Sequence, residues 1–590
     1  MISLQINNQL VNVPEGSTIL QAAKAVGIRI PTLCYVEGMQ HVGACRVCAV
    51  EVEGARNLAA ACSMPAAKGM KVSTNSRRVR HARRLVVELL LSEHNGDCQT
   101  CDRSVDCELQ ALAAELGIRE VAFTGEKTRK RIDTSTPALV RDNGKCIKCR
   151  RCVTVCGEGQ NVGALFPQNR GFETVIGPAF NHDLDTVACV QCGQCAAICP
   201  VGAITEKDQI EDVWKALDDP AKHVIVQTAP AIRAALGECF GYKPGTLVTG
   251  KMVSALRQLG FQAVFDTNFT ADLTIIEEGN ELLSRLRAAL VDHQSVALPM
   301  FTSCSPGWIK FMEYFHPEML PNLSTCKSPQ QMFGAVAKTY YANKLGKRPQ
   351  DIFVVSIMPC TAKKFECERP EMHSSGVRDV DVVLTTRELG KMIRAAGIDF
   401  DRLPDGEMDS PLGLSSGAAD IFANTGGVME AALRTAYEVV TGRELPAANL
   451  HVAPLEGLSG VKQASVTIAG TLPPWKFLEG VTVNVAVAHG LGNAQQLIGA
   501  IQSGQQQFHF VEVMTCPGGC IGGGGQPRFT DNSIREARIA AIYREDEGKK
   551  LRKSHENPAV QKLYEEFLGQ PLGTQSHHLL HTEYTPRPRV

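Results

Sequence analysis

The sequence carries almost no net charge, and this absence argues against one broad class of function. It has 61 Lys and Arg residues against 62 Asp and Glu residues, which gives a formal net charge of −1. A balanced charge provides no long-range field to hold a polyanion. We therefore expect no nucleic-acid partner.

Long hydrophobic runs are also absent. No window approaches the roughly 18 uninterrupted apolar residues that a transmembrane helix needs, and the N-terminus MISLQINNQLVNV has no basic region followed by a long apolar stretch. We therefore expect a cytoplasmic protein without a membrane span. The 590 residues, 44% of them hydrophobic, suffice for several domains with real cores.

Cysteine, in contrast, is abundant. The chain has 22 cysteines, and the cytoplasm keeps thiols reduced, which argues against disulfides and leaves metal ligation as the use that accounts for so many. Fifteen of them lie between Cys34 and Cys199, and the other seven are spread over the rest of the chain. The sequence therefore divides into a dense half, which we call the wiring half, and a sparse half.

The first cysteine group follows a segment with the pattern of a small, half-open β-sheet domain. Residues 2–13 alternate around an Asn-Asn turn like a hairpin, and Thr18 and Gln21 have the spacing of a helix capping box. Four cysteines with the spacing C-x10-C-x2-C-x13-C come next: Cys34, Cys45, Cys48 and Cys62. The C-x2-C element alone fits zinc as well as iron, but one close pair with two distant partners favours a loop around a [2Fe–2S] cluster.

A second group combines one histidine with three cysteines. The helical run HARRLVVELLLSE (81–93) is followed directly by His94, Cys98, Cys101 and Cys107. One His and three Cys bind either structural zinc or a [4Fe–4S] cluster with one imidazole ligand, and the segment alone leaves these two nearly even. The cysteine groups on both sides favour the [4Fe–4S] cluster.

The most specific pattern of the wiring half is a repeated run, C-x2-C-x2-C-x3-C, which begins at Cys146 and again at Cys189. In two-cluster ferredoxins the fourth cysteine of each run ligates the other cluster. One [4Fe–4S] cluster therefore takes Cys146, Cys149, Cys152 and Cys199, and the other takes Cys189, Cys192, Cys195 and Cys156. Repetition of the whole run argues strongly against zinc.

After about residue 215, apolar runs of strand length alternate with helical stretches. Five of these runs are HVIVQTAP (223–230), FQAVFDTNF (261–269), SVALPMFTSC (295–304), DIFVVSIMPC (351–360) and VDVVLTTREL (380–389). This alternation predicts βαβ units and mostly parallel, buried sheets, in which ligands collect outside the carboxyl ends of the strands.

Cysteines stand where several of these runs end. Cys304 and Cys360 end two of them, and Cys516 ends a third, FHFVEVMTC, with Cys520 four residues on in TCPGGCIGGGGQP. We therefore expect distant cysteines to converge on one buried site, where the glycine run lets backbone approach a bulky group. The remaining three are interpreted as core residues: Cys239, Cys326 and Cys367.

Three segments carry a family resemblance. FTSCSPGW (301–308), MPCTAKKFE (358–366) and EVMTCPGGCIGGGGQP (512–527) resemble the three active-site signatures of [FeFe]-hydrogenases. The preceding four-cluster arrangement resembles the wiring of the larger members, among them the catalytic subunits of NAD(P)-linked and electron-bifurcating complexes. The resemblance covers nearly the whole chain.

The resemblance implies an α+β multidomain fold. Its expected order is a β-grasp [2Fe–2S] ferredoxin domain (1–78), a [4Fe–4S] domain with one histidine and three cysteine ligands (79–135), a two-[4Fe–4S] ferredoxin domain (136–210), an α/β H-cluster catalytic domain (211–533) and a helical, small-subunit-like C-terminal segment (534–590). We expect this last segment to wrap the catalytic domain or to form a docking surface. Its histidines, His577, His578 and His581, are expected to be solvated.

The resemblance also implies an H-cluster, in which a [4Fe–4S] cluster shares a cysteine sulfur with a two-iron subsite that carries CO, cyanide and an azadithiolate bridge. By matching positions, Cys360, Cys516 and Cys520 ligate the [4Fe–4S] part, and Cys520 is the shared thiolate. Further residues would surround the subsite: Lys363 and the Pro230 region hydrogen-bonding the cyanides, and Met358 and Met514 packing around it.

One position departs from the family pattern. The first signature usually has two adjacent cysteines before the proline, a proton relay and then a ligand, whereas this chain has Cys304 and Ser305. Either Ser305 ligates through its oxygen and Cys304 is the relay, or Cys304 ligates and the relay is lost. We favour Ser305 as the ligand, because loss of the relay should stop turnover.

A proton path is implied by four further matching positions: Glu278, Ser324, Glu281 and Arg285. Glu278 and Glu281 share one helix face, and Arg285 is four residues from Glu281 and can pair with it. Without the resemblance this pattern is that of an ordinary salt-bridged surface helix. With it, a carboxylate chain between solvent and a thiol provides what proton delivery requires.

The function implied is reversible dihydrogen oxidation and proton reduction, with electrons carried by the four clusters to ferredoxin or to a flavoprotein NAD(P) partner. No glycine-rich dinucleotide fingerprint follows an expected strand, so NAD(P) chemistry would need a separate flavin-bearing subunit. Two alternatives are a sensory hydrogenase, against which Cys304 speaks, and a non-catalytic hydrogenase-like assembly or electron-transfer protein. An assembly protein predicts eroded subsite contacts, whereas Lys363 and two intact signatures are present. An electron-transfer subunit predicts no convergent cysteines after residue 215, and this chain has them.

Overall fold

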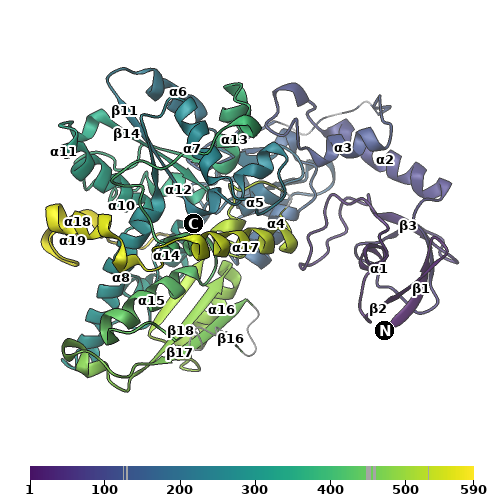
Figure 1. Cartoon of the computed structure of the whole chain (residues 1–590). Coiled ribbons are helices and arrows are strands. Elements are labelled where there is room, and N and C mark those ends of the chain that lie inside the picture. Colours follow the sequence, from purple (N-terminus) through teal and green to yellow (C-terminus); the bar gives the residue numbers. More distant parts are fainter. Residues whose placement is uncertain are drawn as a thin grey trace.

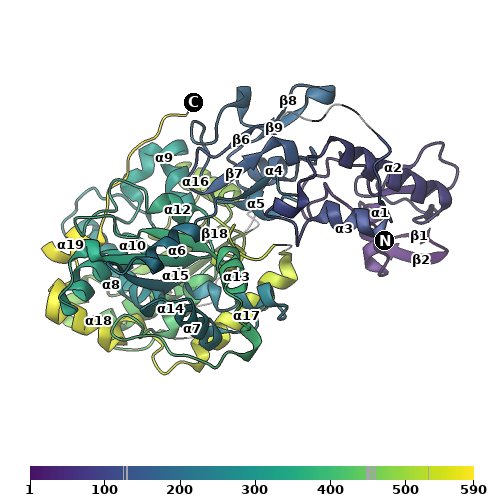
Figure 2. The ribbon, with the colours of Figure 1, turned by 90° about the horizontal axis from the view of Figure 1, so that it is seen from above.

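The computed structural model describes residues 1–123, 125, 127, 130–446, 453–455, 460–528 and 530–589. Figures 1 and 2 show a small N-terminal domain set to one side, a cysteine-rich middle region and a large catalytic part at the far side. These three parts thus follow one another in space in the order of the sequence. No helix within the described ranges is both long and apolar enough to cross a membrane.

The N-terminal domain is a five-stranded sheet in the order β2-β1-β5-β3-β4. Its elements are β1 (Ile2–Ile6), β2 (Gln9–Val13), α1 (Ile19–Ala25), β3 (Ala49–Val52), β4 (Ala59–Ala60) and β5 (Lys71–Ser73). The expected hairpin is present, with Ile2 opposite Val13, and Thr18 and Gln21 form the expected capping box of α1. This sheet confirms the β-grasp prediction for the first domain.

The middle region is built of short elements around its cysteines. They are α2 (Arg77–Glu93), α3 (Glu108–Glu115), β6 (Ile132–Asp133), β7 (Leu139–Asp142), α4 (Arg151–Thr154), β8 (Phe166–Gln168), β9 (Val175–Gly177), α5 (Gln194–Ile198) and β10 (Ile204–Glu206). Strands β10, β7 and β6 form one small sheet, and β8 pairs with β9. Several cysteines belong to the buried core here, together with residues such as Leu109, Leu139 and Ile204.

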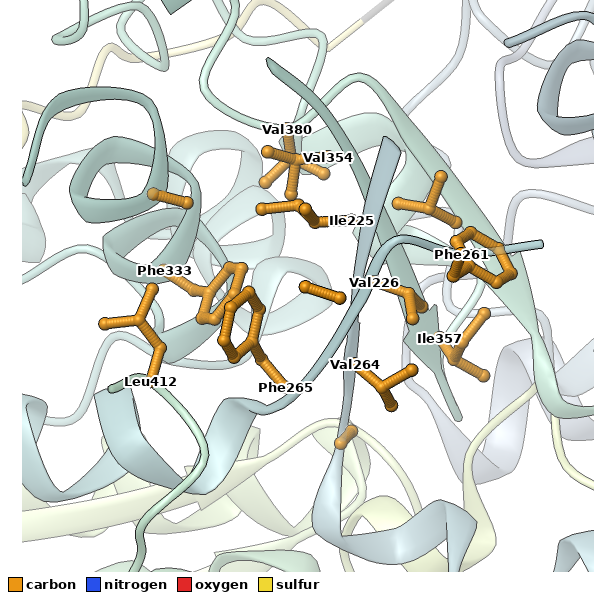
Figure 3. Close-up of a cluster of buried hydrophobic side chains, with 14 of the residues drawn as sticks. Ile225, Val226, Phe261, Val264, Phe265, Phe333, Val354, Ile357, Val380 and Leu412 are labelled. Atoms are coloured by element: carbon orange, nitrogen blue, oxygen red, sulfur yellow. The ribbon is translucent and has the colours of Figure 1, made fainter. Parts of the chain in front are cut away.

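The catalytic part contains a fully parallel four-stranded sheet in the order β12-β11-β14-β15. The strands are β11 (His223–Thr228), β12 (Ala263–Asp266), β14 (Ile352–Met358) and β15 (Val382–Thr385). The helices around it are α6 (Ile210–Asp218), α7 (Thr249–Gln258), α8 (Thr267–Leu290), α10 (Pro329–Val336), α11 (Ala342–Lys344), α12 (Ala362–Glu366) and α13 (Thr386–Ala395). Its core is continuous and apolar, and Figure 3 shows Ile225, Val264 and Phe333 among the packed side chains. The parallel βαβ prediction is confirmed for this sheet.

A second, five-stranded sheet has the order β13-β19-β18-β17-β16. The strands are β13 (Met300–Phe301), β16 (Ala453–Pro454), β17 (Val461–Thr467), β18 (Thr482–His489) and β19 (Phe510–Met514), with α9 (Pro306–Phe315), α14 (Gly417–Asp420), α15 (Gly427–Thr441) and α16 (Leu491–Gln502) in the same part of the chain. Strands β13, β19 and β18 are parallel, whereas β17 and β16 add antiparallel pairs. The antiparallel edge was not predicted from the sequence.

Three strand predictions differ in extent. The run 380–389 forms a strand only over Val382–Thr385, because the Thr385 side chain accepts a hydrogen bond from the Glu388 N–H and caps α13. The run 261–269 forms a strand only to Asp266, whose side chain accepts a hydrogen bond from the Asn268 N–H and starts α8. The run 295–304 forms only the two residues of β13. In these cases polar residues at or after the strand end take capping or loop positions instead of extending the sheet.

The C-terminal segment wraps the catalytic part, as one of the two expectations had it. Its helices are α17 (Asn532–Gly548), α18 (Pro558–Leu563) and α19 (Thr574–Leu580), and Figure 1 shows them in yellow along the outside of the catalytic part. Helix α17 packs on α14, and α19 packs on α10. His577 and His578 are exposed, but His581 is buried, so the prediction of a solvated tail histidine was wrong for His581.

Candidate metal centres

The two ferredoxin-like cysteine runs meet at two adjacent cavities. The first, with about 400 Å³ of atom-free space, is lined by Cys146, Cys149, Cys152 and Cys199. The second, with about 380 Å³, is lined by Cys156, Cys189, Cys192 and Cys195. Because α4 packs on α5, the last cysteine of each run lies with the first three of the other, as the sequence pattern predicts.

The surroundings of these thiols suit clusters. Burial raises the pKa of Cys146 and of Cys156 to about 11, so bound metal must displace protons from both. The Lys148 N–H lies 3.4 Å from the Cys146 Sγ, and the Ala164 N–H lies 3.3 Å from the Cys156 Sγ. Such N–H donors stabilise thiolate ligands and tune cluster potentials.

A third, smaller cavity of about 260 Å³ is lined by His94, Cys98, Cys101 and Cys107. His94 ends α2 and is buried, and its Nδ1 has no hydrogen-bond partner among the described residues. Burial lowers the pKa of His94, which keeps the imidazole neutral, the form that binds a metal. The four predicted ligands of this cluster therefore lie together.

The four N-terminal cysteines, Cys34, Cys45, Cys48 and Cys62, are all buried beside the first sheet. The Sγ atoms of Cys48 and Cys62 lie 3.4 Å apart, and both thiols are free. Arg83 of α2 donates to the Val47 and Ala49 carbonyls at 3.1 Å and holds the cysteine loop against the helix. The structure thus brings this predicted ligand set together as well.

A larger cavity lies where strands of both catalytic sheets end. It encloses about 730 Å³ of atom-free space, roughly twice that of each ferredoxin-like cavity. Strands β11, β13, β14 and β19 all point their carboxyl ends toward it. The predicted site residues that line it are Pro230, Cys304, Ser305, Met358, Cys360, Lys363, Met514, Cys516 and Cys520. The expected convergence of distant cysteines therefore occurs.

The cavity wall is mainly apolar, with a single lysine among its lining residues. Met358 and Met514 are buried at the ends of β14 and β19, and Pro230 begins the turn after β11. The Lys363 Nζ is 3.0 Å from the Cys304 carbonyl oxygen and 2.9 Å from Glu366 Oε2. Both contacts fix the ammonium group at the rim of the cavity.

The Ser305 hydroxyl group lies beside two polar groups of Thr515. The Ser305 Oγ lies 2.7 Å from the Thr515 Oγ1 and 3.3 Å from the Thr515 N, whose N–H points to it. If the threonine hydroxyl is also a donor, the serine oxygen accepts two hydrogen bonds. Two such bonds favour the deprotonated oxygen that a metal ligand requires.

The glycine run makes backbone contacts that the sequence interpretation did not foresee. A Cβ atom on Gly524 would lie 2.3 Å from the Cys192 carbonyl oxygen, and one on Gly523 would lie 2.2 Å from the Pro359 carbonyl oxygen. The run therefore lets backbone approach backbone. Gln194 Nε2 also donates to the Gly522 carbonyl at 3.0 Å, so the ferredoxin-like loop touches the cavity loop directly.

Three of the predicted proton-path residues, Ser324, Glu281 and Arg285, are joined by hydrogen bonds. The Ser324 hydroxyl donates to Glu281 Oε2 at 2.8 Å, and Arg285 Nη2 donates to Glu281 Oε1 at 2.7 Å. Burial, with a further contribution from Glu281, raises the pKa of Glu278 to about 8. Burial and nearby Glu278 raise the pKa of the Cys304 thiol well above its usual range.

Comparison with known proteins identifies the family. The model described as iron only hydrogenase large subunit, C-terminal domain matches residues 222–524, and iron hydrogenase small subunit matches 532–587. Three further models match the wiring half: a 2Fe-2S iron-sulfur cluster binding domain (1–77), an NADH-ubiquinone oxidoreductase-G iron-sulfur binding region (83–122) and a 4Fe-4S dicluster domain (145–203). The chain belongs to the [FeFe]-hydrogenase family.

Individual relatives agree with this. The chain is 53% identical over all of its length to the NADP-reducing hydrogenase subunit HndD of Solidesulfovibrio fructosivorans, all of which is covered. It is 40% identical over 99% of its length to iron hydrogenase 1 of Clostridium pasteurianum, again covered completely. A solved apo [FeFe]-hydrogenase variant from Chlamydomonas reinhardtii is 46% identical, with a TM-score of 0.58, and matches 63% of this chain and 98% of its own.

These findings establish the coarse function. This hydrogenase is an enzyme of dihydrogen catalysis that combines iron–sulfur cluster domains with an H-cluster domain. The multidomain α+β prediction is confirmed in its order of domains. The individual ligands, the proton path and the electron acceptor remain predictions.

Sequence reasoning missed three residues at the hydrogenase site. Glu366 is paired with Lys363 and lies three residues further along α12, a spacing that could have indicated the pair. Thr515 lies inside the third signature, but its contact with Ser305 depends on the parallel pairing of β13 with β19, which no sequence pattern specifies. Glu512 in β19 accepts hydrogen bonds at 2.7 Å from the N–H groups of Gly426 and Met429, and no sequence pattern links these segments.

Proposed function

We propose that this hydrogenase interconverts dihydrogen with protons and electrons at the large cavity and exchanges the electrons, through four iron–sulfur clusters, with an NAD(P)-linked flavoprotein subunit. One observation carries the proposal. Three cysteines, Cys360, Cys516 and Cys520, converge from the ends of two sheets on a cavity whose wall also holds the Cys304 thiol. Such a site can hold a large metal group and move a proton.

The residues present fit an H-cluster. The cavity has roughly twice the atom-free space of each ferredoxin-like cavity, as a [4Fe–4S] cluster with an added subsite needs. Cys360, Cys516 and Cys520 supply thiolates, and burial raises the pKa of Cys520 to about 12, so the thiol is retained until metal displaces its proton. When bound, the H-cluster supplies the metal site at which dihydrogen is split or formed.

Ser305 is proposed as the fourth ligand. Its oxygen is at the cavity wall, and the Thr515 N–H and hydroxyl group lie within hydrogen-bond distance of it. An oxygen ligand is harder than a thiolate and should lower the potential of the iron that it binds. Cys304 is then free to act as the relay.

Lys363 is proposed to hold the anionic ligands of the subsite. Its ammonium group has three donors, and the described contacts engage the Cys304 carbonyl and the Glu366 carboxylate. Both Glu366 oxygens accept from it, at 3.2 and 2.9 Å, so a cyanide nitrogen would take the place of one of these two acceptors. The Pro230 turn would provide a second polar contact for the other cyanide, while Met358 and Met514 exclude water from the cavity.

The proton route begins at Cys304. Its thiol is protonated at neutral pH, and Glu278 is near enough to raise its pKa. Protons are then proposed to pass from Glu278 to the Ser324 hydroxyl, on to Glu281 and out past Arg285, whose side chain is 16% exposed. With a pKa of about 8, Glu278 can both hold and release a proton near neutral pH.

The wiring clusters are proposed to carry electrons in the order of the fold. The cluster of Cys156, Cys189, Cys192 and Cys195 comes first, because its loop touches the H-cluster loop. The cluster of Cys146 follows. The His94 cluster comes next, because the backbone of Gly202, close in sequence to the ligand Cys199, lies against the Cys101 Sγ. The [2Fe–2S] cluster of the N-terminal domain lies furthest out, where a partner can reach it (Figure 1).

An NAD(P)-linked partner is favoured over ferredoxin alone. The relative that is 53% identical over the whole chain is named as a subunit of an NADP-reducing hydrogenase. This sequence has no glycine-rich dinucleotide fingerprint, so a flavin-bearing subunit would have to bind the nucleotide. Such a role also suits the predicted cytoplasmic location.

Purification from the native host tests the proposal. The expected result is a complex with a flavoprotein that reduces NAD(P) with dihydrogen, while the separate matured chain evolves dihydrogen from reduced methyl viologen. A matured chain that isolates alone and transfers electrons only to ferredoxin would contradict the NAD(P) assignment. A chain with all its clusters and no dihydrogen evolution would contradict the proposed catalytic site.

A further inference from the structure

Three side chains of the types that bind metals lie together at one point of the proposed proton path. Glu281 of α8, Cys326 and His581 at the end of α19 are all buried, and their ligand atoms lie within 4.8 Å of one another. Neither Cys326 nor His581 takes part in the proposed electron or proton transfer. The C-terminal segment thus contributes an imidazole to a site that the catalytic domain completes with a thiol and a carboxylate.

His581 is held as a metal-ligating histidine usually is. Its Nε2 lies 3.1 Å from Glu277 Oε2, and Glu277 also accepts hydrogen bonds from the Tyr564 hydroxyl and the Leu572 N–H. Ligating histidines commonly donate their second N–H to such a carboxylate. The other nitrogen, Nδ1, lies 2.8 Å from the Thr325 hydroxyl.

Thr325 places that nitrogen on the side of Glu281. The Thr325 N–H donates to Glu281 Oε2 at 3.1 Å, while its hydroxyl contacts His581 Nδ1. The Cys326 Sγ lies 3.9 Å from the same Glu281 Oε2. The three donors, a thiol sulfur, an imidazole nitrogen and a carboxylate oxygen, therefore face one small volume.

The local charge also favours a cation. Burial raises the pKa of the Cys326 thiol well above its usual range, and the carboxylates of Glu281, Glu278 and Glu277 raise it further. A divalent cation would replace the thiol proton and offset this negative charge. Entry is available beside Arg285 and Glu281, whose side chains are 16% and 11% exposed.

We propose that Glu281, Cys326 and His581 form a binding site for a thiophilic divalent cation of the zinc class. Zinc accepts sulfur, nitrogen and oxygen ligands at about 2.0–2.3 Å in tetrahedral geometry, and water can complete the fourth position. Binding requires that the three side chains close in and that the thiol loses its proton to solvent. The cation also replaces the Ser324 hydroxyl on Glu281 Oε2 and the Thr325 hydroxyl on His581 Nδ1. The site requires both the catalytic domain and the C-terminal segment.

A functional consequence follows, and this part rests on the proposed proton path. A cation on Glu281 Oε2 displaces the Ser324 hydrogen bond, which is the link between Glu278 and Glu281. Zinc is therefore expected to inhibit dihydrogen evolution reversibly. Reduction of the iron–sulfur clusters is expected to continue, because no cluster ligand is involved.

The experiment uses the matured full chain with zinc chloride as the probe. Zinc-edge X-ray absorption, which does not detect the iron, should show one sulfur ligand at about 2.3 Å with lighter ligands at about 2.0–2.1 Å. Dihydrogen evolution from reduced methyl viologen is measured in parallel and again after a chelator is added. Electron paramagnetic resonance verifies that the iron–sulfur clusters stay intact.

Two variants and one control decide the result. Cys326→Ala removes the sulfur contact and should raise the zinc concentration for half-inhibition by at least about tenfold, as should His581→Gln. Cys367→Ala removes another buried cysteine, whose thiol donates to the Lys364 carbonyl, and should leave zinc inhibition unchanged. Cys326→Ala is expected to keep basal activity, which also shows that it folds.

The outcomes separate the site from the path. A zinc spectrum without sulfur, or one that is the same in Cys326→Ala, overturns the proposed site. A zinc–sulfur spectrum that depends on Cys326 and His581 establishes the site. If dihydrogen evolution then continues with zinc bound, the site stands and the assignment of Glu281 to the proton path is wrong.

Discussion

The wiring half and the catalytic half hold their metal ligands in opposite ways. In the wiring half each ligand set comes from one or two short runs, such as Cys98, Cys101 and Cys107, and the elements around them are short. In the catalytic half the proposed ligands Cys360 and Cys516 stand at the ends of strands from two different sheets. Local ligand spacing can be recognised in a sequence, whereas a distributed site exists only once the sheets have formed.

The largest expected effect is a difference in activity between a variant of the catalytic half and a variant of the wiring half. Cys360→Ala removes a proposed thiolate ligand from the proposed catalytic cavity and should abolish dihydrogen evolution from reduced methyl viologen. His94→Ala, in contrast, disturbs one remote cluster and should leave most of this activity, because the small dye can donate to clusters nearer the cavity. The rates of the two variants measure the difference. Equal losses of dihydrogen evolution in the two variants would contradict the view that the cavity is essential and that the dye can bypass a remote cluster.

The next effect separates proton transfer from cofactor assembly. Cys304→Ala should lower dihydrogen turnover by about 10²-fold or more, the size of a lost proton-transfer group, while CO and cyanide infrared bands remain. Cys239→Ala, a change at a cysteine outside the cavity, serves as the control and should keep both. Activity that persists in Cys304→Ala would mean that Cys304 is not the relay.

A smaller effect concerns pH. The pKa of Glu278 is raised to about 8, so the carboxyl group is protonated at pH 7. Dihydrogen evolution needs that proton and should fall as pH rises through about 8, whereas dihydrogen oxidation needs the free carboxylate and should rise over the same interval. Because the folded-state pKa exceeds the unfolded one, Glu278 also lowers folding stability progressively from about pH 4.5 to 8. A rate profile without a transition near 8, and unchanged in Glu278→Asp, would contradict the assignment.

The smallest effect is expected at the position where this chain departs from its family. Ser305→Cys supplies a thiolate in place of the serine oxygen and should preserve the H-cluster while it raises the potential of the [4Fe–4S] part. The matched change Ser303→Cys alters a nearby serine whose hydroxyl donates to the Cys326 carbonyl and should leave that potential unchanged. Redox titration followed by infrared spectroscopy measures the shift. No difference between the two variants would argue that Ser305 is not a ligand.

Much of the wiring half could be predicted from the sequence because its chemistry is local. The exchange of Cys156 and Cys199 between runs follows from spacing alone, and the cavities gather the same residues. The hairpin of residues 2–13 and the capping box at Thr18 are equally local, since a turn and a helix start depend on neighbouring residues.

The catalytic half could be predicted only in part. Strand ends indicated that Cys304, Cys360 and Cys516 would converge, but not that Thr515 would lie beside Ser305, because that contact depends on the pairing of β13 with β19 across 210 residues of sequence. His581 was taken for a solvated residue, since nothing near it in the sequence shows that α19 packs against α10. The antiparallel strands β16 and β17 were also missed.

Infrared spectroscopy of the chain matured with its two-iron subsite tests the central claim most directly. If the cavity of Cys360, Cys516 and Cys520 holds an H-cluster, the spectrum shows CO and cyanide bands, and these bands are lost in Cys520→Ala while the signals of the wiring clusters remain. A matured chain that shows only iron–sulfur signals, without CO and cyanide bands, would contradict the account.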